Sequence, residues 1–465
     1  MKPADLSQLG FSALVACEDL PSNLPNLIET DSRKDLSGKW YWPIVGETFN
    51  GHDFIGEALE KGAIGFCYER GELIDSSLLD KASNFAVDNS LSALQSLARW
   101  WRQQHPNCKV IGITGSNGKT TAKEIIAHIL KAQKPTLYSK GSFNNEIGLP
   151  LTLCQMTEHT QVAVLEMGAR HTGDIRFLSN IAGQDVSILL NIGTAHLGEF
   201  GSAAALRETK QEILTQTPRA TIAIVPEEDE LSCKSARDHH DNVITFGYSP
   251  DANVAIQASS IKADGSCHLT FKLWQKETIE ICVPFFHLAL EPNIAAALAC
   301  SLAMKLDLDA AIRTLTSFTG VARRFEIKQK GQLTIIDDTY NANPQSMLSG
   351  LQSIQKAYPQ EKPVLILGDM LELGETSQFE HERIGAFVGK TLNACTLVAV
   401  GEQSKSLIDS AKKEGMPSDR LYHYTDQQTL INDIDNVVKH GNLLYAKASN
   451  GIRLYQVIDY LMHKT

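Results

Sequence analysis

The chain has 465 residues, which at about 150 residues per domain predicts about three domains. Hydrophobic residues make up 43% and charged residues 21% of the chain, a globular composition that excludes a disordered or fibrous protein. The formal net charge of −11 argues against a general binder of nucleic acid or acidic membranes, which would carry an excess of cations. We therefore expect no nucleic-acid partner.

Cysteine usage and hydropathy indicate the compartment. Nine scattered cysteines without a Cys-x-x-Cys pair predict neither a disulfide framework nor a zinc site, and they favour a reducing compartment. No apolar run reaches the ~20 residues that a membrane span requires. We therefore expect a cytoplasmic protein without a membrane span.

The first segment, residues 1–85, has clusters of Gly, Asn and Asp between short apolar runs. This pattern predicts a small α/β domain, because such clusters mark the turns between short strands and helices. Apolar residues spaced by three and four then predict a helix between Leu91 and Trp101.

Residues 86–319 are expected to form the central domain. Short apolar runs separated by helix-length stretches predict a mostly parallel sheet covered on both faces. These runs lie at 110–113, 162–165, 186–190 and 222–225. Between 253 and 283 alternate residues are apolar, which predicts an antiparallel appendage, and a helix at 294–304 precedes the boundary.

Residues 320–465 repeat the alternation of strand and helix. Candidate strands lie at 333–336, 364–367, 397–400 and 443–445. They predict a second doubly wound, Rossmann-like domain. The predicted fold class is therefore α/β with three domains, the central one a doubly wound parallel sheet with a P-loop.

The strongest functional signal is VIGITGSNGKTT at 110–121, a glycine-rich turn between a buried strand and an amphipathic helix. In this context backbone N–H groups can surround phosphates at the positive end of the helix. Lys119 is expected to reach the β and γ phosphates of a nucleotide, and Thr120 to offer its hydroxyl to Mg²⁺. The spacing departs from G-x-x-x-x-G-K-[ST], because Ile113 takes the first glycine position, so a plain glycine-rich turn is the alternative.

Two further polar residues follow predicted strands. Glu166 follows the run at 162–165, and His196 lies shortly after the run at 186–190. Ligands bind at this edge of open parallel sheets, and a carboxylate and a neutral imidazole suit a divalent metal bound to ATP. Taken singly, each has an ordinary explanation as a helix-start carboxylate or an exposed loop histidine. Their repeated placement beside the P-loop favours the metal site.

Several motifs together resemble the Mur ligases, a family that also includes folylpolyglutamate synthase. The Thr-Gly-x-x-Gly-Lys-Thr variant, LEMGA at 165–169 and NIGTAHLGEFGS at 191–202 are typical of it. DSRKDLSGKWYWPIVGETFNGHDFIGEAL resembles an N-terminal uridine-nucleotide domain of the family. GSFNNEIGLPLTL, DDTYNANPQSM and LGDMLELGETSQFEH are similar to its central and C-terminal signatures.

The resemblance implies an ATP-dependent acid–D-amino-acid ligase of peptidoglycan precursor synthesis. ATP would phosphorylate the carboxyl group of UDP-N-acetylmuramoyl-tripeptide, and the amine of D-alanyl-D-alanine would displace phosphate from the acyl phosphate. The implied cofactors are ATP and Mg²⁺, and a monomer is expected. Residues 1–85 would bind the UDP-sugar peptide, 86–319 ATP, and 320–465 would form the ligase domain.

The resemblance also implies residue roles. Lys119, Glu166, His196 and Lys210 would be catalytic; Thr120 and Glu166 would hold one Mg²⁺, His196 a second, and Lys210 would become a carbamate that ligates metal. The nucleotide would be bound by Gly115, Ser116, Asn117, Gly118, Lys119, Thr120, Thr121, Asn293, Arg324 and Asp338. Asn144 and Asn145 match a loop near the nucleotide, although Asn pairs also form turns. The uridine nucleotide would contact Asp31, Ser32 and Arg33, together with Gly51, His52 and Asp53, which can equally shape a turn.

The chain departs from the family pattern at two places. Leu290 replaces a usual asparagine three residues before Asn293, and Lys447-Ala448-Ser449-Asn450 replaces Lys-Gly-Ser-Arg. We therefore assign no role to the second stretch. Two alternatives remain: a folylpolyglutamate synthase, which would lack the N-terminal segment, and a catalytically silent nucleotide switch. The third residue of the tripeptide, diaminopimelate or lysine, stays open.

Overall fold

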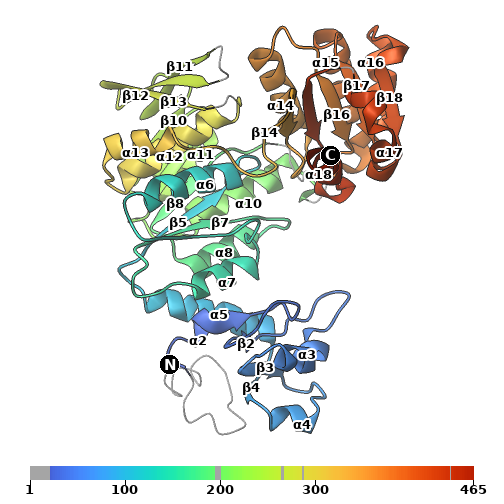
Figure 1. Ribbon diagram of the computed structural model, residues 1–465. Coiled ribbons are helices and arrows are strands. Elements are labelled where there is room, and N and C mark those ends of the chain that lie inside the picture. Colours follow the sequence, from blue (N-terminus) through green and yellow to red (C-terminus); the bar gives the residue numbers. More distant parts are fainter. Residues whose placement is uncertain (1–20, 194–199, 263–265, 285–286, 440, 465) are drawn as a thin grey trace.

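The computed structural model describes every residue except 1–20, 194–199, 263–265, 285–286, 440 and 465. Three separate sheets follow one another along the chain, each with helices packed against it, and they form three successive units in Figure 1. This arrangement confirms the predicted α/β fold class, with its antiparallel addition and its second doubly wound sheet.

The N-terminal unit has a four-stranded parallel sheet in the order β1-β2-β3-β4. Its strands are β1 (Ile28–Glu29), β2 (Trp40–Tyr41), β3 (Gly65–Glu69) and β4 (Ser83–Val87), and its helices α2 (Leu24–Leu27), η1 (Gly51–Phe54), α3 (Ile55–Glu60) and α4 (Ser76–Leu79). Trp42 Nε1 donates to the Ser90 carbonyl at 2.7 Å, at the start of α5 (Ser90–Gln103). Asn26 Nδ2 donates to the carbonyls of Cys154 and Met156, both at 2.7 Å, which anchors this unit to the central one.

The central unit contains one nine-stranded sheet in the order β13-β12-β11-β10-β9-β8-β5-β7-β6. Its strands are β5 (Lys109–Thr114), β6 (Thr136–Tyr138), β7 (Val162–Glu166), β8 (Val186–Leu189), β9 (Ile222–Pro226), β10 (Asn242–Gly247), β11 (Val254–Ile261), β12 (Cys267–Leu273) and β13 (Glu277–Val283). Neighbours from β6 to β11 run parallel, and β11, β12 and β13 are antiparallel.

Helices cover both faces of the parallel part. Ile111 and Ile113 pack into a core with α6 (Lys119–Lys131), α12 (Leu290–Ala303) and α13 (Leu308–Leu315). Val110 packs into the opposite core, whose helices are α5, α7 (Gly148–Cys154), α8 (Asp174–Ala182), α10 (Ala203–Thr215) and α11 (Glu230–His239). Burial on both faces explains why the strands read as continuous apolar runs.

The C-terminal unit has a six-stranded sheet in the order β14-β15-β19-β16-β17-β18, with only β14 antiparallel. Its strands are β14 (Glu326–Lys330), β15 (Leu333–Asp337), β16 (Val364–Gly368), β17 (Thr396–Val400), β18 (Leu421–Tyr424) and β19 (Leu443–Lys447). Its helices are α14 (Pro344–Ala357), η2 (Gly374–Thr376), α15 (Ser377–Thr391), α16 (Lys405–Lys413), η3 (Ser418–Arg420), α17 (Gln427–Val438), η4 (Asn450–Ile452) and α18 (Tyr455–His463).

Over the part of the chain that the structure describes, no helix has the length and apolar character needed to cross a bilayer.

Candidate active site

The P-loop joins β5 to α6. Gly118 has a φ of +83°, and a Cβ at this position would lie 2.7 Å from Asn293 Oδ1, so only glycine fits here. Asn293 is buried in the first turn of α12 and packs against the loop. Asn191, which follows β8, holds the loop from the other side: its Oδ1 accepts from Asn117 N and its Nδ2 donates to Asn117 O, both at 2.9 Å. Sequence reasoning missed Asn191, although it opens the NIGTAH motif.

Lys119 is the first residue of α6, and its side chain folds back over the loop. Nζ donates to the carbonyls of Gly115 at 2.8 Å and Ser116 at 3.3 Å. Burial lowers the pKa of Lys119 from its ordinary value, an effect that nearby Glu166 opposes and Arg324 reinforces. The loop, the helix start and this cation together form a site for an anion.

Glu166, at the end of β7, lies against the P-loop helix. Its carboxylate accepts from Thr120 Oγ1 and from Asn144 Nδ2, each at 2.8 Å, and the residue is 2% exposed. The turn that carries Asn144 is tied to α6 by fully buried Lys123, whose Nζ donates to the Ser139 carbonyl at 2.6 Å. The cluster therefore brings a hydroxyl, a carboxylate and an amide to one point.

Lys210 lies on α10 and is 2% exposed. Burial lowers the pKa of Lys210 to about 7, and the charge of Lys119 adds to the effect, whereas Asp174 and Glu212 oppose it. Its helix is fixed to the start of α8, because Glu212 accepts from Gly173 N at 3.0 Å and Arg176 N at 2.9 Å. His196, the other predicted metal ligand, lies outside the described residues.

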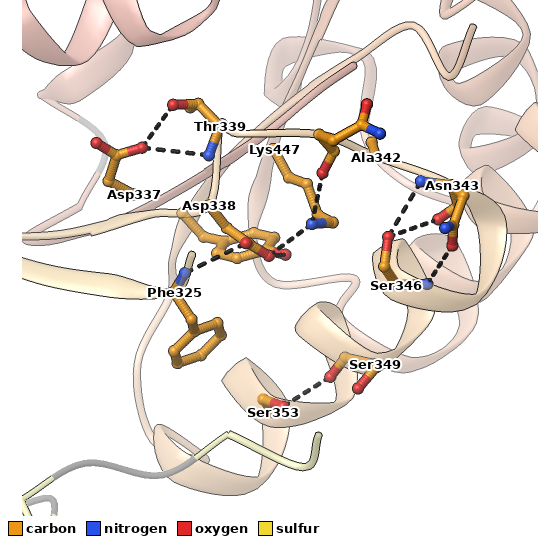
Figure 2. Close-up of polar contacts among 12 residues, drawn as sticks. Phe325, Asp337, Asp338, Thr339, Ala342, Asn343, Ser346, Ser349, Ser353 and Lys447 are labelled. Carbon is orange, nitrogen blue, oxygen red and sulfur yellow. Dashed lines mark hydrogen bonds and ion pairs between the residues drawn. The ribbon is translucent and has the colours of Figure 1, made fainter. Parts of the chain in front are cut away.

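The C-terminal unit adds cations to the same region. Arg324 Nη2 donates to Thr120 Oγ1 at 2.9 Å, and its guanidinium lies 4.0 Å from the centre of the Tyr340 ring. Asp338, which follows β15, accepts from Lys447 Nζ at 2.8 Å (Figure 2). It also accepts from Tyr445 OH at 3.0 Å. The structure thus brings Arg324 directly to the P-loop and places Asp338 in a buried network.

Three residues of the altered 447–450 stretch, Lys447, Ser449 and Asn450, belong to the cavity wall. Lys447 Nζ donates to the Asn341 carbonyl at 2.9 Å as well as to Asp338, and Ser449 Oγ accepts from Leu371 N at 2.9 Å. Sequence reasoning assigned them no role. The retained lysine and serine of the motif were the available signal, because they occupy the family positions.

His287 is a second residue that sequence reasoning missed. It lines the cavity, and its ring centre lies 4.5 Å from that of Phe325. Its Nε2 is buried with no hydrogen-bond partner among the described residues, and burial lowers the pKa of His287 to about 4, so the ring is neutral. Only its position before α12 could have drawn attention to it.

A cavity of about 1190 Å³ contains these elements, with walls from the central and C-terminal units and with Glu47 from the N-terminal unit. All the predicted nucleotide-binding residues line it except Gly115, whose carbonyl accepts from Lys119 Nζ. Glu166, Lys210, Asn144 and Asn145 line it too. The arrangement can hold a polyphosphate and a second, acidic substrate together.

The six residues predicted to bind the uridine nucleotide do not line this cavity. Arg33 donates to Asp31 through Nε at 2.8 Å and Nη2 at 2.9 Å, and this bonding lowers the pKa of Asp31 to about 2. Adjacent Ser32 is buried. The three residues form a separate polar segment on the N-terminal unit.

Gly51, His52 and Asp53 form the short helix η1 of that unit. A Cβ at Gly51 would lie 2.6 Å from the Ile44 backbone nitrogen, so the chain needs glycine there. His52 Nδ1 lies 2.7 Å from Asn50 Oδ1, and Nε2 accepts from Glu69 N at 3.0 Å. Both ring nitrogens of His52 are therefore engaged within the protein, which gives this residue a role in shaping the turn.

Comparison with known proteins agrees with this geometry. The family description "Mur ligase middle domain" matches residues 113–301, and "Mur ligase, glutamate ligase domain" matches residues 323–450. The chain is 32% identical to UDP-N-acetylmuramoyl-tripeptide–D-alanyl-D-alanine ligase of Bacillus subtilis (strain 168), over 94% of this chain and 93% of that protein.

Solved structures agree as well. A crystal structure of MurF from Acinetobacter baumannii matches with a TM-score of 0.83 and 30% identity, over 94% of this chain and 93% of that one. MurF ligase from Thermotoga maritima in complex with ADP matches with a TM-score of 0.81 and 28% identity, over 95% and 98% of the two chains. The chain belongs to the Mur ligase family, and the relatives described above are ligases.

Proposed function

We propose that this protein is an ATP-dependent ligase that joins D-alanyl-D-alanine to UDP-N-acetylmuramoyl-tripeptide in peptidoglycan precursor synthesis. The relatives carry this activity in their names and match almost the whole chain. The observation that carries the proposal is the meeting of Thr120, Glu166 and Arg324 at the P-loop within one cavity. A ligase needs such a cavity, because three reactants must meet there.

The chemistry needs an activated acid, since a carboxylate is a poor electrophile. A carboxylate oxygen of the tripeptide attacks the γ-phosphorus of ATP, and ADP leaves. The dipeptide amine then attacks the acyl carbon, loses a proton, and inorganic phosphate leaves. Negative charge collects on phosphoryl oxygens in both steps, so Lys119, Arg324 and the P-loop N–H groups would supply much of the stabilisation.

Magnesium fits the donor set around Glu166. The Thr120 hydroxyl and the Glu166 carboxylate lie 2.8 Å apart, and oxygen atoms are the ligands that Mg²⁺ prefers. Thr120 and Glu166 would hold the ion, with His196 assigned to a second one by the family resemblance. The bound ion would neutralise charge on the phosphates.

Lys210 is proposed to carry a carbamate. A buried amine with a pKa of about 7 is neutral in a large fraction of molecules near neutral pH, and only the neutral amine can add CO₂. The product is an anionic oxygen group in place of a cation, suited to a site that binds Mg²⁺.

The three units would divide the substrates between them. We assign the uridine nucleotide to residues 1–85, ATP to 86–319 and the closing ligase surface to 320–465. The separation of Asp31 and Arg33 from the cavity supports this division, since the UDP end of a long substrate must lie away from its reacting carboxyl group.

A mass-spectrometric ligation assay tests the function. Purified protein should form the pentapeptide product and release phosphate only with ATP, Mg²⁺, D-alanyl-D-alanine and the UDP-linked tripeptide together. Parallel reactions with diaminopimelate and lysine tripeptides identify the third residue. ATP turnover that ignores both co-substrates would contradict the proposal and indicate a nucleotide switch.

Lys119→Ala provides the matched inactive variant. Its ligation rate should fall by about 10²–10³-fold with an unchanged circular dichroism spectrum, because the side chain faces the loop carbonyls and the cavity. Near-normal product formation by the folded variant would refute the P-loop assignment.

A further inference from the structure

The side chain of Asn117 links the P-loop to the C-terminal unit. Its Nδ2 donates to Gln345 Oε1 at 2.9 Å, and its Oδ1 accepts from Asn343 Nδ2 at 2.7 Å. The bonded residues are 228 and 226 positions apart in the chain. Both ends of a single P-loop amide are therefore occupied by the neighbouring domain.

The P-loop side of this contact is held rigidly. Asn191 bonds to both the N–H and the carbonyl of Asn117, which fixes the direction of the side chain. Gly193 provides the space for Gln345, because a Cβ at Gly193 would overlap Gln345 Oε1. Gln345 thus lies against two separate loops of the central unit.

The C-terminal side is equally well defined. Asn343 is the N-cap of α14: its Oδ1 accepts from Ser346 N at 2.8 Å, and Ser346 Oγ accepts from Asn343 N at 3.0 Å (Figure 2). This capping box fixes the Asn343 side chain and leaves its Nδ2 to reach Asn117. The helix cap and the interdomain contact use different atoms of one amide.

We propose that Asn343 and Gln345 are positioning residues that act through Asn117 and hold the C-terminal domain over the phosphate loop during ligation. The inference rests on the ligase function proposed above. Arg324, Asp338 and Lys447 belong to the same domain as Asn343 and Gln345, so an amide contact that orients the domain also orients those charged groups. Loss of the contact slows the steps that need both domains.

A double-mutant cycle between Asn117 and Gln345 tests this inference. Gln345→Ala should lower kcat by about fivefold, the effect of about one lost hydrogen bond, while the KM for the UDP-linked tripeptide stays within twofold. Asn117→Ala should be at least as slow, and adding Gln345→Ala to it should cost less than twofold more. Full additivity of the two changes, or wild-type kcat in Gln345→Ala, would overturn the proposal.

Gln355→Ala is the matched control, because Gln355 lies on the same helix and donates within its own domain, to the Thr391 carbonyl at 3.4 Å. Its kcat should equal that of the wild type. A fall matching that of Gln345→Ala would mean that kcat responds to any change on α14, which would overturn the proposal.

Small-angle scattering of the full chain with Mg²⁺ and ADP gives a readout that does not depend on ligation. Gln345→Ala should shift the ensemble towards a larger radius of gyration than wild type and Gln355→Ala, with an unchanged melting temperature. An identical radius in all three proteins would contradict the positioning role. If Gln345→Ala shows the larger radius but the wild-type protein has no ligase activity, the positioning role holds and only the proposed function is refuted.

Discussion

Of three lysines around the P-loop, Lys123 and Lys210 are buried and Lys119 is half-buried, and their surroundings differ. Lys123 donates to the carbonyls of Ser139 and Gly141 and pairs with Glu124 at 3.0 Å, so its charge is compensated. Lys119 donates to two loop carbonyls. Lys210 makes no hydrogen bond to a described residue, and burial lowers the pKa of its amine to about 7, although Asp174 and Glu212 oppose the effect. The Lys210 amine is therefore the one whose protonation state should matter for activity.

Ligation should therefore depend on pH through Lys210. The folded pKa of about 7 lies below the ordinary 10.5, so the neutral amine is depleted as pH falls through 7. We expect kcat to fall about tenfold for each pH unit below that value at fixed CO₂, and to recover when bicarbonate is raised. A kcat that stays constant from pH 8 to pH 6 would contradict the carbamate.

Substitutions of Lys210 separate a carbamate from a simple cation. Lys210→Ala and Lys210→Arg should both lose at least 10²-fold in kcat, because neither side chain can add CO₂. A short carboxylic acid should restore part of the activity of Lys210→Ala by supplying the missing oxygens. Full activity in Lys210→Arg would show that charge alone suffices.

Lys123 should affect nucleotide binding indirectly, by holding Asn144 and Glu166 in position. Lys123→Met keeps the length of the side chain but leaves the Ser139 carbonyl without its donor, at a cost of about 1–3 kcal/mol. We expect a lower melting temperature and a higher KM for Mg²⁺-ATP. Lys131→Met on the same helix is the control, since Lys131 is exposed over the Tyr138 ring. Equal melting temperatures and equal KM values for Mg²⁺-ATP in the two variants would show that the buried lysine has no positioning effect.

At the scale of the element, helix α15 depends on two glycines where α16 crosses it. A Cβ at Gly385 would overlap the Leu407 carbonyl, and one at Gly389 would lie 2.6 Å from Glu414 Cβ. Gly385→Ala should therefore destabilise the C-terminal unit by about 1–3 kcal/mol through overpacking. Calorimetry should show a lower melting temperature for the transition of this unit.

Gly56→Ala is the matched control for that prediction. Gly56 lies in α3, and a Cβ there would have no neighbour within 4 Å. This substitution should stabilise its helix by about 0.5–1 kcal/mol, because alanine loses less backbone entropy on folding. Similar destabilisation by both substitutions would refute the packing explanation.

Elements buried on both faces were predictable from the sequence, and the edge strand β14 was not. The runs at 110–113, 162–165 and 222–225 correspond to β5, β7 and β9, because parallel strands between helix layers are continuously apolar. The antiparallel edge strand β14 has the sequence EIKQK and is only half-buried. Its charged residues do not form the apolar pattern from which a strand is predicted. Helix α12 begins at Leu290, four residues before the predicted start, because Pro292 is tolerated in a first turn.

The same contrast applies to the site. Local sequence predicted the P-loop and the placement of Glu166 at the end of a strand, since both depend on one strand and the residues after it. Contacts between distant segments could not be predicted: Lys447 reaches Asp338 from 109 positions away, and Asn343 reaches Asn117 from 226. Such pairs depend on the strand order and on how the domains pack. The roles of the individual residues stay predictions.

At the scale of the whole molecule, the N-terminal unit and the cavity should bind different parts of the substrates. The Asp31–Arg33 pair lies in the N-terminal unit, outside the cavity that contains the P-loop. A long substrate can therefore be held at its UDP end by one unit while its carboxyl group reacts in another. Binding energy gained at the distant end positions the reacting carboxyl group beside ATP.

Arg33→Ala should consequently weaken binding of the UDP-linked tripeptide about tenfold or more, because the guanidinium, although paired with Asp31, is 84% exposed and can also contact a ligand. Calorimetric titration should show unchanged ADP affinity, since the P-loop lies in another unit. Arg70→Ala is the control: Arg70 belongs to the same unit and pairs with Asp88 at 2.6 Å, away from residues 31–33 in the chain. Loss of ADP affinity in Arg33→Ala would contradict the division of binding between the units. An equal loss of affinity for the UDP-linked tripeptide in both variants would contradict it as well.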